Sequence, residues 1–312
     1  MMGRADRLPN SGVVAARDDD PLTVPADWPN REASRHVLSY GTRWHVQRMG
    51  AGPTLVLLHG TASSTHSFRD LLPLLATSFD VLAVDLPGHG FSSRLPDGAM
   101  TLPAIARGLS GLFETLELTP RFLVGHSAGA AIALRFALDA REAPEAIVGL
   151  NAALMPFGGM LTRVFSPLAQ FFASTRLMPA LLARRAMDRK AVERVIRGTG
   201  SVIDAAGIDG YQRLFSREAH LSAVLAMMAS WDLSRLRREL PALGNRVLLL
   251  AGARDRAVNP GEAARVADDL RCASVMMFED GGHLAHEERP RQVADIIRRF
   301  CMEPGEPLAH PD

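Results

Sequence analysis

The chain has 312 residues, of which 47% are hydrophobic and 22% are charged, so it can bury a sizeable core and is not globally disordered. Lys and Arg number 35 against 34 Asp and Glu, a balance that gives the chain as a whole no field to recruit nucleic acid or an anionic membrane. We therefore expect a globular protein without nucleic acid as a partner.

The two cysteines, Cys272 and Cys301, stand in separate contexts and form no disulfide framework, which is typical of a reducing compartment. No stretch reaches the roughly 18 apolar residues of a spanning helix, and the first residues lack the apolar block of a secretory signal. The sequence thus predicts a cytoplasmic protein without a membrane span.

The first residues are rich in Asp, Arg, Pro and Gly without a sustained period, which predicts a mobile tail. The length favours one core with an inserted subdomain. The predicted boundaries are a tail at 1–27, a core built from 28–154 and 237–302, a helical cap at 155–236 and a second tail at 303–312.

Within the core, short apolar runs alternate with helical patterns. The predicted strands are Trp44–Arg48, Thr54–Leu58, Val81–Asp85, a run that begins at Phe122, Ala146–Asn151, Arg246–Gly252 and Ser274–Phe278. The predicted helices include about Ser67–Leu75, Leu102–Leu116, Gly261–Leu270 and Pro290–Phe300. Strands separated by helices predict an α/β fold with a mostly parallel, doubly wound sheet.

From about Met155 to Leu236 the alternation stops and only helical periodicity remains. Breaks at Pro156, Pro167, Pro179, Gly198, Gly200, Gly207 and Gly210 predict several short helices, placed over the carboxyl edge of the sheet. The methionines of this cap fit a ligand pocket, although core packing is the favoured role for most of them. Arg184 and Arg185 could meet a substrate carboxylate, but a solvated helix face is the favoured interpretation.

The run Gly125-His126-Ser127-Ala128-Gly129 follows an apolar strand and opens a helical pattern. In such a Gly-x-Ser-x-Gly turn the serine adopts a strained backbone, and the glycines remove side chains that would strike the neighbouring strand and helix. The turn aims the Ser127 hydroxyl out of the sheet. This pattern predicts a nucleophile elbow with Ser127 as the nucleophile.

A serine nucleophile needs a base to take its proton and a carboxylate to orient that base. Asp255 comes just past one buried strand and His283 just past the next, so both side chains are expected at the same sheet edge as Ser127. The predicted triad is Ser127, His283 and Asp255.

Other residues compete for these roles less well. Asp232 lies at the end of the cap and Asp280 precedes the histidine, while Asn151 cannot supply a negative charge. His89, His126 and His286 do not sit at a strand-terminal loop in the required order.

Two backbone N–H groups are the candidates for an oxyanion hole. Ala128 stands at a helix start, where its N–H can meet an oxyanion, and Thr61 follows the His59-Gly60 turn after a strand. The Thr61 hydroxyl or Ser63 could add a donor. The loop Asp85–Gly90 is expected to be structural.

No cofactor or metal is expected, because the chain has no phosphate loop or dinucleotide fingerprint. The spacing of His283, His286 and Glu287 also matches neither usual zinc helix motif.

With the His59-Gly60 turn, the Asp85 loop, the elbow, Asp255 and His283 in this order, the chain resembles the α/β-hydrolase superfamily over about residues 35–302. A closer resemblance is to the BchO family, hydrolase-like magnesium chelatase accessory proteins of bacteriochlorophyll biosynthesis. It is carried by the segments 28–35, 125–133, 226–233 and 282–288.

The closer resemblance implies a pathway rather than a reaction. It makes a tetrapyrrole a candidate small-molecule ligand and magnesium chelatase components candidate partners. Two functions stay open: a serine hydrolase for an ester or related acyl bond, and a non-catalytic porphyrin-binding or chelatase-associated protein.

Overall fold

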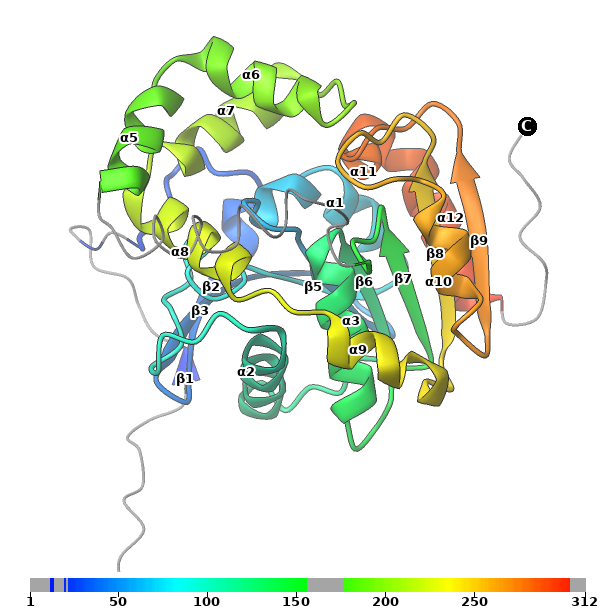
Figure 1. Ribbon diagram of the computed structural model, residues 1–312. Helices are drawn as coiled ribbons and strands as arrows, with labels where there is room; N and C mark the ends of the chain where they lie inside the picture. The colour runs from blue at the N-terminus through cyan, green and yellow to red at the C-terminus, as the bar shows by residue number, and fades with distance from the viewer. Residues whose placement is uncertain (1–11, 14–19, 21, 156–176, 304–312) are drawn as a thin grey trace, which may run out of the picture.

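The computed structural model describes residues 12–13, 20, 22–155 and 177–303. In this part of the chain nine strands form one sheet in the order β1-β2-β3-β5-β4-β6-β7-β8-β9 (Figure 1). The strands are β1 (Gly12–Val13), β2 (Ser34–Ser39), β3 (Thr42–Met49), β4 (Thr54–Leu58), β5 (Asp80–Val84), β6 (Phe122–His126), β7 (Ala146–Leu150), β8 (Arg246–Gly252) and β9 (Ala273–Phe278). All pairs from β5 to β9 across the sheet are parallel, which confirms the predicted α/β fold.

Helices cover both faces of the sheet, which is why the central strands β4, β6 and β7 are apolar along nearly their whole length. One face is covered by α1 (Leu71–Leu75) and α12 (Pro290–Met302). The other is covered by α2 (Leu102–Thr115), α3 (Ala128–Asp139), α9 (Ser234–Glu239) and α10 (Glu262–Ala267). Four short helices complete these layers: η1 (Arg31–Ala33), η2 (Thr65–Phe68), η3 (Leu240–Ala242) and α11 (Ala285–Glu288).

A set of helices lies over the carboxyl edge of the sheet, at the top of Figure 1. It comprises α5 (Leu177–Ala186), α6 (Arg189–Gly198), α7 (Ala205–Phe215) and α8 (Glu218–Ala229). The predicted cap end at residue 236 falls inside α9, where Leu236 is buried in the core. The part of the predicted cap at 156–176, with Pro156 and Pro167, lies outside the described residues.

The chain is anchored earlier than the predicted boundary at residue 28. Val24 is buried with Trp28, Phe91 and Leu214, and Asp27 pairs with Arg213 of α7 at 2.7 Å. Two strands were also not predicted, β1 and β2. β2 lies between β1 and β3 and carries polar residues on both of its faces, so its sequence lacks the apolar alternation of a half-buried strand.

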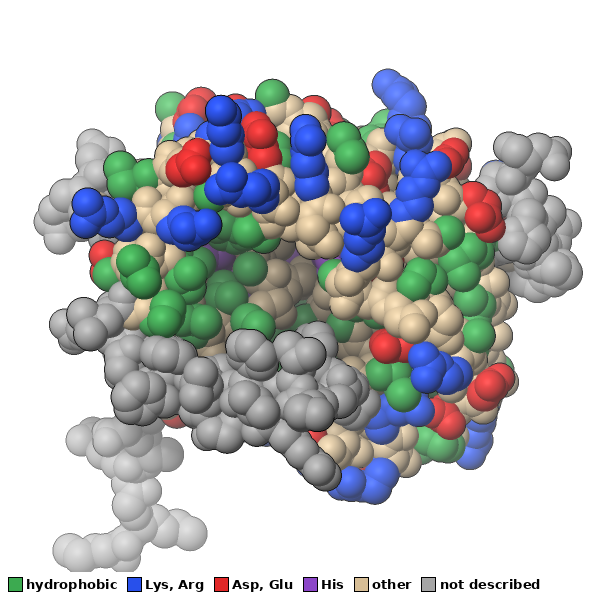
Figure 2. Space-filling view, turned by 45° about the horizontal axis from the view of Figure 1, so that its top comes forward, with side chains coloured by type: hydrophobic (Ala, Val, Ile, Leu, Met, Phe, Trp, Pro, Cys, Tyr) green, Lys and Arg blue, Asp and Glu red, His purple; other side chains and the backbone are tan. Residues whose placement is uncertain are grey.

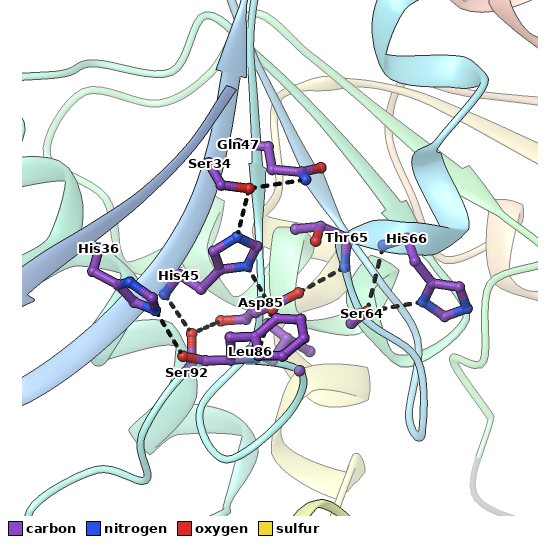
Figure 3. A network of polar contacts seen from close by, with 12 residues as sticks. Ser34, His36, His45, Gln47, Ser64, Thr65, His66, Asp85, Leu86 and Ser92 are labelled. Atoms are coloured by element: carbon purple, nitrogen blue, oxygen red, sulfur yellow. Dashed lines mark hydrogen bonds and ion pairs between the residues drawn. The ribbon is translucent and has the colours of Figure 1, made fainter. Parts of the chain in front are cut away.

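A fully buried carboxylate, Asp85, ties three segments together behind the sheet edge (Figure 3). Its Oδ2 accepts hydrogen bonds from His45 Nδ1 at 2.7 Å and from the Phe91 N–H at 2.8 Å. Its Oδ1 accepts the Thr65 N–H at 2.6 Å. The hydrogen-bond network extends further through His45, whose Nε2 lies 3.0 Å from Ser34 Oγ. Asp85 therefore has a structural role, since it holds the loop that follows β4 in place.

Replacing Asp85 with Asn should destabilise the protein by about 3–5 kcal/mol. Both carboxylate oxygens accept N–H groups, so whichever one becomes an NH₂ would face a donor. Burial alone would raise the pKa of Asp85, but His45 holds it below the ordinary value. The wild type should thus lose this stabilisation as the pH falls below about 4, and the variant should not.

Urea unfolding of both proteins measures the difference, with Asp97→Asn on an exposed loop as the control. Equal stability of Asp85→Asn and the wild type would contradict the assigned role.

Candidate active site

Ser127 lies between β6 and α3 with backbone angles φ 52° and ψ −116°. Residues other than glycine rarely adopt a positive φ. A Cβ atom on Gly125 would lie 2.4 Å from the Ala130 nitrogen, and one on Gly129 would lie 2.2 Å from the Leu58 oxygen. Only glycine fits at these two positions. A nucleophile elbow requires such a tight turn from strand to helix.

Asp255 follows β8 and His283 follows β9, and the two side chains meet. His283 Nδ1 donates to Asp255 Oδ2 at 2.8 Å, and both residues are buried. The other carboxylate oxygen of Asp255 accepts the N–H groups of Ala257 at 2.7 Å and Val258 at 2.9 Å. With Nδ1 used as a donor, the Nε2 of a neutral His283 is the nitrogen that can accept a proton.

The rival acids are occupied elsewhere. Asp232 Oδ1 accepts the Ser234 N–H at 2.8 Å, at the start of α9. Asp280 pairs with Arg254 at 2.5 Å on the exposed surface.

Asn151 is a site residue whose role sequence reasoning missed. It was set aside because it carries no charge, but its Nδ2 donates to Asp255 Oδ2 at 2.9 Å. Asn151 also has a positive φ of 46°, which turns the chain at the end of β7. Its position directly after a buried strand, at the same sheet edge as Asp255, was the signal that could have placed it there.

His126 is the second missed residue. Its Nε2 donates to the backbone oxygen of His283 at 2.9 Å, so the residue before Ser127 holds the backbone of the histidine. Burial, with His286 and His283 nearby, lowers the pKa of His126 well below its ordinary value, so the ring is neutral. The spacing of the elbow motif gave no sign of this contact.

The two candidate oxyanion donors, Thr61 and Ala128, both border the same cavity as Ser127. Ala128 is the first residue of α3, where a backbone N–H has no acceptor within the helix. The Thr61 N–H has no hydrogen-bond partner among the described residues. The turn before Thr61 is fixed by His59, whose Nε2 accepts the Leu86 N–H at 2.9 Å.

The cavity has a volume of about 280 Å³ and reaches from Ser127 and His283 to the cap. Figure 2 shows the hollow on this face, with histidine side chains visible inside it. Its cap side is formed by α6, α7, α8 and the segment that follows. The apolar and aromatic residues there are Val195, Ile196, Tyr211, Phe215, Met227, Met228 and Trp231.

None of the described residues that line this cavity is Asp, Glu, Lys or Arg. Arg184 and Arg185 are exposed on α5 and do not line it. A wider hollow of about 600 Å³, bordered by Arg48 and Asp80, lies at the opposite end of the strands and contains none of the candidate residues.

In the part of the chain that the structure describes, no group of three or more His, Cys, Asp or Glu side chains is placed to hold a metal ion. No described helix is both long and apolar enough to cross a bilayer.

A family model for the alpha/beta hydrolase family matches residues 55–296, over the sheet and site just described. The chain belongs to the α/β-hydrolase family. It is also 40% identical over 270 residues to the magnesium-chelatase 30 kDa subunit of Rhodobacter capsulatus, covering 86% of this chain and 94% of that protein. This relative confirms the closer resemblance to the magnesium chelatase accessory proteins.

Other similar proteins are enzymes by name. A pimeloyl-[acyl-carrier protein] methyl ester esterase of Stenotrophomonas maltophilia is 30% identical over 272 residues, covering 82% of this chain and 95% of the esterase. Among solved structures, the epoxide hydrolase CorEH superposes with a TM-score of 0.72 at 23% identity, covering 86% of this chain and 97% of that one. At this identity the likeness to CorEH shows the fold alone.

A buried polar cluster joins the cap to the core beside the cavity. Tyr211 of α7 borders the cavity, and its hydroxyl donates to Glu287 Oε1 at 2.8 Å. The other oxygen of Glu287 pairs with Arg69, which also pairs with Asp204 at 2.8 Å. Ser63 Oγ lies 3.4 Å from the Tyr211 hydroxyl. Removing Tyr211 or Arg69 would leave a buried oxygen of Glu287 without its partner.

This cluster predicts a pH dependence of stability. Burial raises the pKa of Glu287 to about 7, against the opposing effects of Arg69 and Tyr211. The folded protein therefore binds more protons than the unfolded chain between about pH 4 and pH 7, and its free energy of unfolding should fall as the pH rises through that window, by at most about 3 kcal/mol.

Urea unfolding at several pH values measures this slope. Glu287→Gln should flatten it, and the exposed control Glu142→Gln should not. An unchanged slope in Glu287→Gln would contradict the assignment.

Proposed function

We propose that this chain is a serine hydrolase for an ester or related acyl bond. Ser127 Oγ attacks the acyl carbon while His283 Nε2 takes the hydroxyl proton, and Asp255 stabilises the imidazolium that results. The N–H groups of Ala128 and Thr61 bind the oxyanion of the tetrahedral intermediate. Its collapse expels the alcohol, which leaves with the proton from His283, and water then releases the acid by the reverse sequence.

One observation carries this proposal: the 2.8 Å hydrogen bond from His283 Nδ1 to Asp255, with Ser127 held in its strained turn on the same cavity. Asp255 is itself held by three N–H donors, from Asn151, Ala257 and Val258. A carboxylate fixed in this way selects one tautomer and orientation of the imidazole, which proton transfer needs and passive binding does not.

The cavity supports an uncharged acyl group. Burying an ionised carboxylate against apolar side chains without a partner is strongly unfavourable, and the described lining offers no cation. We propose that the substrate belongs to bacteriochlorophyll biosynthesis around the magnesium chelatase step, and that a tetrapyrrole ester is one candidate. Support for the pathway comes from the name of the Rhodobacter capsulatus relative. Both cysteines are free thiols, which supports a cytoplasmic site of action.

The second candidate function is non-catalytic binding of a porphyrin or of a chelatase component. It is favoured by the same relative, because that protein is named as a subunit rather than as a hydrolase. Under this hypothesis the Ser127, His283 and Asp255 side chains have no chemical role.

A fluorophosphonate probe, which reacts with activated serines, separates the two functions. The wild type should be labelled at Ser127, Ser127→Ala should not be labelled, and His283→Ala should react slower by about three orders of magnitude or more. Ser110→Ala, on the exposed side of α2, is the matched control and should react like the wild type. An unlabelled wild type, or full labelling of Ser127→Ala, would refute the hydrolase.

A further inference from the structure

The balanced charge of the whole chain hides a strong local excess on the cap. Residues 177–202, which contain α5 and α6, hold six Lys and Arg against two Asp and Glu, leaving 29 basic and 32 acidic residues elsewhere. The chain as a whole carries almost no net charge, but a positive field is present on this part of the surface.

Most of these cations are not neutralised by neighbours. Arg189 pairs with Glu193 and Asp209, and Arg194 lies 3.7 Å from Asp188. The other four form no ion pair with a carboxylate in the described part of the chain: Arg184, Arg185, Lys190 and Arg197. All four are exposed.

Exposed hydrophobic side chains gather on the same subdomain. Five of the eight large hydrophobic residues that are exposed in the described ranges belong to the cap or its connections. They are Leu181, Met187, Val195, Val202 and Met228, exposed by 53–72%. Figure 2 shows Lys and Arg side chains above the hollow, with hydrophobic side chains between and below them.

The cavity opens among these residues. Val195 of α6 and Met228 of α8 both line it, although each is more than half exposed, so they form its mouth. An apolar mouth leading to an uncharged cavity suits a molecule that partitions into lipid.

We propose that the cap docks on an anionic lipid bilayer through Leu181, Arg184, Arg185, Met187, Lys190 and Arg197, called here the basic cap face. Cations above anionic headgroups and aliphatic side chains between them are the two features that hold proteins at such an interface. An acidic protein would satisfy the charges, but it gives no reason for an apolar cavity to open beside them. The bilayer accounts for both, because a lipophilic substrate could pass from it into the cavity.

Flotation with lipid vesicles tests this proposal. The full chain should float with vesicles of phosphatidylcholine and phosphatidylglycerol, should stay unbound with phosphatidylcholine alone, and should be released by high salt. Arg184→Glu with Arg185→Glu should weaken binding about tenfold or more. Leu181→Asn with Met187→Asn, which keeps every charge, should weaken it as well.

The matched control is Arg141→Glu with Arg291→Glu, which reverses two exposed arginines of the core and should bind like the wild type. Absence of binding to anionic vesicles would overturn the proposal and leave an acidic protein as the partner of these cations. Equal loss in the control pair would overturn it too. Ser127→Ala should still float, so the result is independent of the hydrolase test.

Discussion

The backbone turn at Ser127 is the constraint on which the rest of this site depends. A parallel strand must end and a helix must begin within two residues, and both must pack so closely that Gly125 and Gly129 have no room for a Cβ atom. The buried sheet around the turn offsets this strain, since β6 lies between β4 and β7 and is covered by α3. The outcome is a hydroxyl presented at the sheet edge at a fixed angle.

Two buried carboxylates hold the loops around Ser127 in place by hydrogen bonds. Asp85 gathers backbone N–H groups and His45, and so fixes the loop that carries Thr61. Asp255 gathers Asn151 and two backbone N–H groups, and so fixes His283. Each pairs a carboxylate with a histidine, but Asp85 and His45 are completely buried, whereas His283 reaches a cavity. Access to the cavity, rather than the pairing itself, separates a candidate catalytic histidine from a structural one.

Much of the fold was predictable because parallel strands buried on both faces have a strong signal. The strands Thr54–Leu58 and Arg246–Gly252 were placed to the residue. β2 was missed because a strand with polar residues on both faces has no such pattern. Ser127, Asp255 and His283 were predicted from their residue types and their order in the chain. In the structure Asp255 contacts His283, and Ser127 and His283 line the same cavity.

Contacts between segments far apart in the sequence could not be predicted. The bonds from Asn151 to Asp255 and from His126 to the His283 backbone depend on how neighbouring strand ends are spaced in the sheet. The basic cap face was not predicted for a different reason. The net charge is a sum over the whole chain, whereas the electrostatic field of a cluster of cations acts locally.

The central claim is that this protein serves its pathway by chemistry at Ser127. It is tested most directly in a bacteriochlorophyll-producing strain that lacks the gene and carries wild type, Ser127→Ala or Ser110→Ala at equal protein levels, with pigment and magnesium-free porphyrin measured. Ser127→Ala should fail to restore pigment while melting at the wild-type temperature, and Ser110→Ala should restore it. Full restoration by Ser127→Ala would show that the chemistry of Ser127 is not needed.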